Sequence, residues 1–327
     1  MRCEAQASGS HLASRSEQSA RLMLGYVIRR LLGLVPVLFF VALITFVLMH
    51  LAPGGPWDAE RRLPPQVEAN LNAKYHLDEP LPVQFAYYLG GLLRGDLGLS
   101  FTNPGYSVQA VIGRGLGVTL QLGVLAAAVA VLVGVPLGVL AALRKNSPLD
   151  YGAMFVAIFG YTTPAFVLGI FLIVLFAVQW RVLPPGGWGR PAQMVMPVIA
   201  LAAAPTAILA RYTRASMLDV TGQDYVRTAQ SKGLADRTVI MRHMLRNALM
   251  PIITVLGPVM AALVTGSFVI ERMFRIPGIG RLYIDAIFAR DYPLIMGTTL
   301  LYAVAVALFN LLADVMYVVV DPRISYT

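Results

Sequence analysis

The residue types that most often carry chemistry in proteins are few in this chain and lie far apart. No phosphate-binding GxxxxGK[ST] motif is present, and the only lysines are Lys74, Lys145 and Lys232. HExxH is also absent, and the four histidines are scattered along the sequence as His11, His50, His76 and His243. We therefore expect no ATPase site, no metal site and no cofactor in this chain, and the sequence predicts that it is not an enzyme.

A charged segment stands out against this background. Residues 224–251 read DYVRTAQSKGLADRTVIMRHMLRNALMP, with five Arg or Lys residues and two acids between long uncharged stretches. The pattern predicts a short helix that ends at Gly233, where a left-handed residue would cap it. Arg242 and Arg246 share one face of a second predicted helix, whose mainly apolar stripe consists of Leu234, Thr238, Met241, Leu245 and Leu249.

The charge pattern of this segment alone leaves two functions open. A basic amphipathic helix can lie on the anionic lipid heads of a membrane. A compact pair of helices can instead dock into a cleft of a cytoplasmic partner and pass that partner's movement to the next apolar helix, which begins near Pro251.

Membrane helices must hold this segment in place. The chain has 327 residues, of which 57% are hydrophobic and 13% charged, and this is too apolar for a soluble domain. A hydrocarbon core ~30 Å thick needs about 20 apolar helical residues. Six stretches qualify, so we predict an all-α membrane protein with spans at residues 31–51, 119–143, 151–180, 194–211, 247–270 and 292–318.

Two further segments lie outside these spans. Residues 1–22 are rich in Ser and Ala without apolar periodicity, which predicts a disordered tail, and Met23 is an alternative start. Residues 52–117 are too long for a plain connection and are predicted to hold helices at 65–75 and 82–93. This insert either seats an external partner or packs on the bundle as a lid.

Charge predicts the orientation of the spans. Arg29 and Arg30 abut the first span on one side, whereas no basic residue follows it until Arg61, and basic residues favour the cytoplasmic side. Both termini and residues 224–251 are therefore expected in the cytoplasm. The net charge of +9 is attributed to this topology and to anionic lipid, because no basic-aromatic platform for nucleic acid is visible.

One acid, Asp314, interrupts the last span. Ionisable groups within a membrane often serve ion-coupled transport. Asp314 lies within a turn or two of the expected cytoplasmic end, so pairing with a neighbouring helix, or contact with the interface, is favoured over a proton relay. We therefore expect the energy source of this protein to lie elsewhere.

The charged segment resembles the cytoplasmic coupling loop, or EAA loop, of ABC importer permeases, in the form found in B-type permease subunits of peptide importers. We call residues 216–250 the coupling loop. The matching residues are Asp224 to Ala229, Ser231 to Leu234, His243, Leu245 to Ala248, and Pro251. The general pattern has Glu where this chain has Arg227, which places a glutamate contact with an ATPase in doubt.

The resemblance extends over nearly the whole chain from Met23. Further matching segments are residues 26–36, 52–56, 95–98 with Ser100, 271–274, 277–282, 290–293 and 321–323. Gly55 is a departure, because such permeases often carry an acid there.

The resemblance implies a type I ABC importer permease, with residues 23–327 as its transmembrane domain in the bacterial cytoplasmic membrane. Its expected partners are a C-type permease in a heterodimer, two cytoplasmic ATPases that bind ATP and Mg, an external binding protein and a short peptide substrate. The residues expected to couple the chain to the ATPases are Asp224, Tyr225, Arg227, Ala229, Lys232, Gly233, Leu234, Arg242, His243, Arg246 and Asn247.

A second expected site is an outer gate. Residues 277–280 have the composition of a tight turn, and the helix after it has an apolar side made by Tyr283, Ile284, Ile287 and Phe288. We expect this segment to dip back against the outer mouth of the path, with gate residues Glu271, Phe274, Pro277, Gly278, Gly280, Arg281 and Asp291. The alternative function is a stand-alone channel or an ion-coupled secondary transporter.

Overall fold

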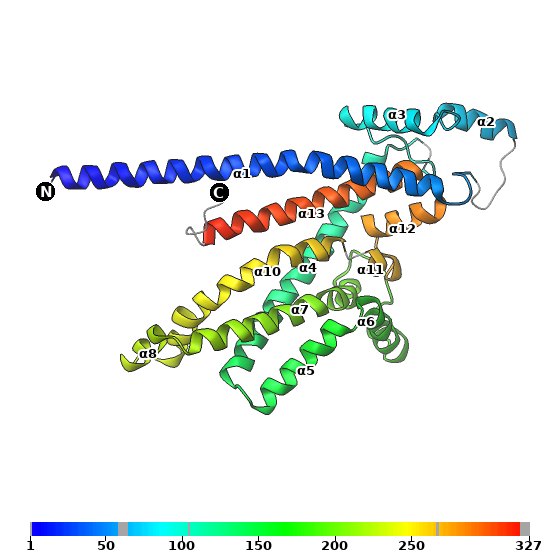
Figure 1. The fold of residues 1–327 in the computed structure, drawn as a ribbon. Helices are drawn as coiled ribbons and strands as arrows, with labels where there is room; N and C mark the ends of the chain where they lie inside the picture. Colours follow the sequence, from blue (N-terminus) through cyan, green and yellow to red (C-terminus); the bar gives the residue numbers. More distant parts are fainter. Residues whose placement is uncertain (1, 58–64, 104, 266–267, 321–327) are drawn as a thin grey trace.

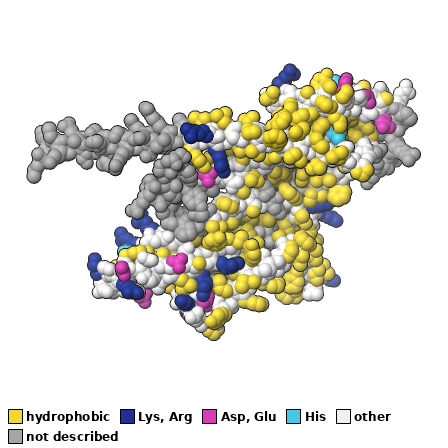
Figure 2. All heavy atoms as spheres, viewed as in Figure 1, with side chains coloured by type: hydrophobic (Ala, Val, Ile, Leu, Met, Phe, Trp, Pro, Cys, Tyr) yellow, Lys and Arg dark blue, Asp and Glu magenta, His cyan; other side chains and the backbone are white. Residues whose placement is uncertain are grey.

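Long helices carry most of the chain in the computed structural model, which describes residues 2–57, 65–103, 105–265 and 268–320 (Figure 1). Within these ranges five helices are long and apolar enough to cross a membrane, or six if one bent pair forms a single span. Hydrophobic side chains cover much of the visible flank, and charged ones gather toward the ends (Figure 2). The expected all-α membrane fold is confirmed.

The elements that the structure describes are helices. In chain order they are α1 (Arg2–Leu51), α2 (Pro65–Lys74), α3 (Leu81–Leu93), α4 (Val108–Leu143), α5 (Pro148–Thr162), α6 (Ala165–Leu172), the π-helix η1 (Ile173–Gln179), α7 (Pro191–Thr221), α8 (Asp224–Ser231), α9 (Asp236–Thr238), the π-helix η2 (Val239–Met244), α10 (Leu245–Thr265), α11 (Phe268–Met273), α12 (Ile279–Ala289) and α13 (Tyr292–Val320). The two helices of the insert, α2 and α3, agree with the sequence prediction to within one residue.

The N-terminal segment differs from its prediction. The backbone of residues 2–22 continues α1 as one helix (Figure 1), where the sequence predicts a disordered tail. No proline separates this segment from the first span, and Ala, Glu, Gln and Arg are good helix formers. Because adding a residue to an existing helix costs far less than starting one, the span extends the helix into residues whose own pattern gives no helical signal.

The third predicted span, residues 151–180, is broken into two helices. The axes of α5 and of the stretch Ala165–Gln179 differ by 104°, and Thr163 between them is extended (φ −81°, ψ 120°). Pro164 causes the break, because proline lacks a backbone N–H and disfavours helical geometry in the residue before it. The predicted span is therefore bent, and it counts as a single span only if the two helices are taken together.

A stripe of small residues brings α4 and α7 together at the centre of the bundle. The buried residues of α4 recur every four positions as Ala126, Ala130, Gly134 and Gly138. A Cβ atom at Gly134 would lie 2.7 Å from the Thr206 backbone oxygen, and one at Gly138 would overlap the Ala210 backbone oxygen. Small residues allow such close backbone approach in membranes, where packing rather than the hydrophobic effect joins helices.

Asp314 finds its partners on α1, which packs beside α13. Its Oδ2 accepts a hydrogen bond of 2.8 Å from the Tyr26 hydroxyl and lies 3.5 Å from a guanidinium nitrogen of Arg30. The carboxylate thus pairs with a neighbouring helix, which is the structural role that the sequence analysis favoured.

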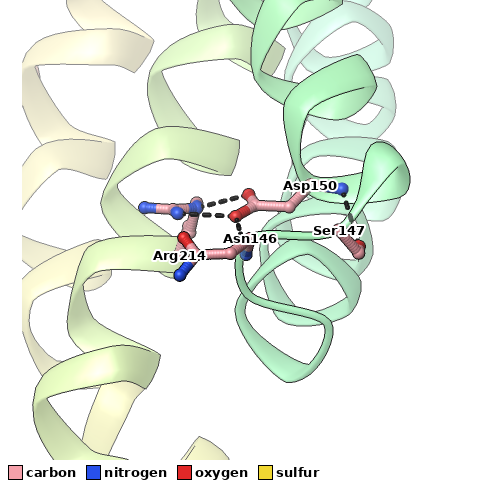
Figure 3. A network of polar contacts seen from close by, with 4 residues as sticks. All are labelled: Asn146, Ser147, Asp150 and Arg214. Atoms are coloured by element: carbon pink, nitrogen blue, oxygen red, sulfur yellow. Dashed lines mark hydrogen bonds and ion pairs between the residues drawn. The ribbon is translucent and has the colours of Figure 1, made fainter.

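A second ion pair joins α5 to α7 (Figure 3). Arg214 Nε and one of its terminal nitrogens donate to the two carboxylate oxygens of Asp150 at 2.6 and 2.7 Å. The Asp150 side chain is 1% exposed and that of Arg214 is 26% exposed. Asp150 also accepts from the Asn146 backbone N–H at 3.0 Å, so the pair fixes the α4–α5 connection against α7.

Gly138→Ala is expected to destabilise the protein by about 1–3 kcal/mol, because the added methyl group would lie 2.6 Å from the Thr213 Cβ in a packed interface. Thermal unfolding in detergent measures the effect. Gly117→Ala on the same helix is the matched control, because no atom lies within 4 Å of the added carbon. Equal stability of the two variants would contradict the close packing of α4 on α7.

Asp150→Asn is expected to lower stability by up to about 3–5 kcal/mol, because it removes one partner of a largely buried ion pair and leaves the other charged. Adding Arg214→Met should recover part of this loss, since the double variant leaves no unpaired charge. Unfolding of the two single variants and of the double variant gives the coupling energy. Strictly additive losses would argue against the pair.

Candidate functional site

The first helix that lies wholly within the coupling loop is α8, which ends in a hydrogen-bonded glycine cap. Gly233 has a φ of +73°, and its N–H donates to the Gln230 carbonyl at 2.9 Å. The Leu234 N–H donates to the Ala229 carbonyl at 3.4 Å. This pair of bonds is the Schellman arrangement, so the predicted left-handed cap at Gly233 is confirmed.

One face of α8 attaches the loop to the bundle. Val226 is fully buried and Ala229 is 5% exposed. Both belong to a hydrophobic cluster that draws on α4, α7, η2 and α10, and whose fully buried members include Met217 and Ala248. The sequence analysis proposed Ala229 as a contact for a partner, but the structure turns its side chain into this cluster. Ala229 therefore holds the loop in place.

The buried stripe of the second helix also differs from its prediction. The buried residues are Val239, Met244, Ala248 and Ile252, whereas Met241 of the predicted stripe is 59% exposed. The spacing of five between Val239 and Met244 reflects η2, whose π-helical turn is wider than an α-helical one. A period of 3.6 residues cannot anticipate this shift. Leu245 and Leu249 of the predicted stripe do pack against the core, whereas its first three residues are exposed.

The outer face of the coupling loop combines exposed apolar and charged side chains. Tyr225, Leu234 and Met241 are 40%, 39% and 59% exposed. The exposed polar and charged residues from the predicted set are Asp224, Arg227, Lys232, Arg242, Arg246 and Asn247, and His243 is half-buried. Figure 2 shows charged side chains gathered at this end of the molecule. We call Tyr225, Gly233, Leu234 and Met241 the tip surface.

The tip surface is joined rigidly to a membrane helix. Helical backbone runs without a break from Asp236 through η2 into α10, which continues past Pro251 to Thr265. A push on η2 therefore acts directly on α10, and α8, which residues 232–235 join to this helix, acts through its contact with η2.

At the opposite end of the bundle, the predicted gate residues form a buried polar network around Glu271. The Glu271 side chain is fully buried, and its Oε1 accepts a 2.8 Å hydrogen bond from the Thr119 hydroxyl of α4. The same hydroxyl accepts from the Ile279 backbone N–H at 2.8 Å, and Glu271 Oε2 accepts from the Arg281 N–H at 3.2 Å. This network ties the start of α12 to α4.

The glycines of the turn before α12 permit close approach. A Cβ atom at Gly278 would overlap the Glu271 carboxylate, and one at Gly280 would lie 2.7 Å from the Phe268 Cα. Phe274 is fully buried, and its carbonyl accepts from the Gly187 N–H at 2.7 Å. Pro277 is exposed. Glycine is thus needed here for space around the carboxylate.

The apolar face of α12 differs from its prediction. Ile279 and Ala286 are the buried residues of this helix, together with Gly280, whereas Ile287 and Phe288 are 46% and 72% exposed. Tyr283 of the predicted apolar side is half-buried and packs against the hydrophobic core. The exposure of Ile287 and Phe288 was not visible in the hydrophobic pattern.

Asp291 anchors the insert to the start of α13. It is fully buried, and its Oδ2 accepts from the hydroxyl groups of Ser100 and Thr102 at 2.5 and 2.7 Å. Its Oδ1 accepts from the Leu294 backbone N–H at 3.2 Å, as an N-terminal cap of α13. Nearby, Arg290 donates to the Gly55 carbonyl at 3.0 Å, so this position contributes a backbone oxygen although it has no acidic side chain.

The sequence analysis missed the residues that complete these sites. Thr119 and Thr102 supply hydroxyl groups to the two buried acids, and Asp150 with Arg214 forms the ion pair near the coupling loop. A single hydroxyl in an apolar stretch gives no signal of its partner. In the part of the chain that the structure describes, no three His, Cys, Asp or Glu side chains gather as a metal site would require.

Comparisons with known proteins agree with this geometry. Two family models match: "Binding-protein-dependent transport system inner membrane component" over residues 134–326 and the N-terminal model of the same systems over residues 23–122. The dipeptide transport system permease protein DppB of Bacillus subtilis is 46% identical over 93% of this chain and 98% of its own length. The oligopeptide transport system permease protein OppB of Escherichia coli K12 is 42% identical over 93% of this chain and its full length.

Solved structures show the same fold. The inward-facing MetNI methionine ABC transporter superposes with a TM-score of 0.55 at 17% identity, covering 64% of this chain and 96% of the other. An amino acid ABC transporter gives 0.51 at 22% identity, covering 65% and 94%. The fold implied by the sequence resemblance, that of a type I ABC importer permease, is confirmed. The chain belongs to the family of inner membrane components of binding-protein-dependent transport systems, and it is a multi-pass inner-membrane protein.

Proposed function

We propose that this chain is the B-type permease subunit of an ABC importer that moves short peptides into the cell. The observation that carries the proposal is the pairing of a coupling loop with an unbroken helix into the membrane, in a chain whose full-length relatives are named as dipeptide and oligopeptide permeases. ATP and Mg are bound and used by two separate cytoplasmic ATPases. A C-type permease completes the path, and an external binding protein delivers the peptide.

In this proposal the tip surface docks into a cleft on an ATPase. Tyr225, Leu234 and Met241 offer apolar side chains to the cleft, and the surrounding arginines fix the orientation of the loop. Closure of the ATPases moves α8 and η2, and α10 follows because its helix is continuous with η2. The access of the path then switches from one side of the membrane to the other. Both termini lie in the cytoplasm.

The Glu271 network is proposed to hold the outer gate closed. Hydrogen bonds join Glu271 to Thr119 and Thr119 to the N-terminus of α12. Glu271 lies on α11, which follows α10 in the chain. Movement of α10 can therefore break these bonds together. Asp291 keeps the insert attached to α13 whether the outer gate is closed or open. An insert held in this way suits a surface that seats the binding protein.

The alternative of an ion-coupled carrier is less well supported. Asp314, the acid that would carry a coupling ion, is engaged by Tyr26 and Arg30. A carrier of that kind would transport peptide in vesicles without any ATPase. Replacement of Asp314 would then abolish transport, whereas the present proposal assigns Asp314 to the packing of α1 on α13.

Gly233→Val is expected to uncouple ATP hydrolysis from uptake, because a branched residue at a φ of +73° costs roughly 1–2 kcal/mol and disturbs the cap. Gly233→Asn is the matched control, since Asn tolerates the left-handed conformation. The measurement is the number of ATP molecules hydrolysed per peptide in proteoliposomes, with co-purification of the ATPases. A Val variant that docks and transports like the Asn variant would refute the role of the cap.

Thr119→Val is expected to loosen the outer gate, because Glu271 loses a hydroxyl donor and the Ile279 N–H loses its acceptor, at a cost of about 1–3 kcal/mol. The measurement is the rate at which a small fluorescent dye leaks from proteoliposomes that contain the nucleotide-free complex, which reports how well the outer gate closes. Thr119→Ser keeps the hydroxyl group and should stay tight. If the Val variant is as tight as the Ser variant, the network does not seal the path.

A further inference from the structure

A cavity at the coupling-loop end of the bundle has walls from three helices. It has a volume of about 750 Å³ and lies between α5, α7 and α10. Small-molecule sites in proteins have volumes of about 300–1,000 Å³, so a short peptide segment fits. The α10 wall, formed by Val255, Pro258, Val259 and Ala262, is apolar and belongs to the helix that continues from η2.

The opposite wall carries a positive charge that the chain does not neutralise. Arg211 and Arg214 both line the cavity. Arg214 is already paired with Asp150 in a bidentate contact. Arg211 forms no ion pair with any residue that the structure describes, and its guanidinium carbon lies 5.9 Å from the centre of the Tyr161 ring. The cavity therefore presents one uncompensated cation beside aromatic side chains.

Arg211 lies at the boundary between the predicted span and the coupling loop. It is the last residue of the predicted span 194–211 and lies in α7 about 15 Å before the helix ends, at a rise of ~1.5 Å per residue. An arginine fork matches the two oxygens of a carboxylate.

We propose that Arg211 binds the terminal carboxylate of the transported peptide in this cavity. The proposal rests on the peptide-importer function proposed above and adds the group of the cargo that this subunit recognises. Tyr161, whose ring centre lies 5.9 Å from the guanidinium carbon, and Tyr212 line the same cavity, and the apolar α10 wall faces the body of the peptide. Movement of α10 with the coupling loop changes the width of the cavity and releases the peptide.

Equilibrium binding of radiolabelled trialanine to the purified complex, without its binding protein and in phosphatidylcholine nanodiscs, tests the proposal. The wild type should bind trialanine, and trialanine amide should compete at least about tenfold less well. Arg211→Gln should weaken trialanine binding by about tenfold, and Arg211→Lys should recover part of it. Arg144→Gln, which removes an exposed arginine outside the cavity near the α4–α5 connection, should bind like the wild type.

Three outcomes would overturn the proposal. Equal trialanine affinity in the wild type and Arg211→Gln would show that the guanidinium does not contact the peptide. Loss of wild-type binding when phosphatidylglycerol is added, with Arg211→Gln unaffected, would assign the arginine to a lipid phosphate. Loss of the partner permease from the Arg211→Gln complex would assign it to the subunit interface.

ATP-dependent uptake of trialanine by wild-type proteoliposomes separates this proposal from the function on which it rests. Uptake by the wild type together with unchanged binding by Arg211→Gln would refute the carboxylate site and leave the importer function standing. Absence of uptake by the complete wild-type complex would refute both.

Discussion

A polar group buried in this bundle needs a hydrogen-bond partner within the protein, because neither lipid nor the apolar interior offers one. Glu271 and Asp291 are fully buried, and each is surrounded by hydroxyl and backbone N–H donors. Asp150 is matched by a bidentate arginine. These acids connect α4 to α12, the insert to α13, and α5 to α7. Buried charged groups thus fix the relative positions of elements that apolar packing alone would not fix.

Hydrophobic length and the turn residues were enough to predict the helices, the two helices of the insert and the glycine cap at Gly233. Two features of backbone geometry were not predicted: the size of the 104° break at Pro164 and the π-helical turn in η2. Proline in a membrane helix is usually tolerated, so its presence does not reveal which helix it breaks. A π-helical turn has no compositional signature, yet it places the buried residues Val239 and Met244 five positions apart.

The candidate sites were predicted only in part, because the partners of their residues lie far away in the chain. Sequence resemblance identified Glu271, Gly278 and Asp291, but their partners Thr119 and Thr102 are 152 and 189 residues away in the chain. Such pairs are fixed by the tertiary fold, which one sequence does not display. Ala229 shows the converse, because it matched the family pattern while its side chain is 5% exposed and serves internal packing. A motif residue can therefore position a contact surface without being part of it.

The three neighbours of α7 explain where motion can occur. Toward α4 its backbone is in such close contact that Gly134 and Gly138 leave no room for a methyl group, and toward α5 it is held by the Asp150 pair. Toward α10 it shares a buried cluster that includes Leu209 and Ile252, and it also borders a cavity of about 750 Å³. A packed interface resists displacement, whereas an unfilled volume can change at small cost. Because α10 is continuous with η2, we expect force applied at the coupling loop to move α10 relative to α7 and to change the volume of this cavity.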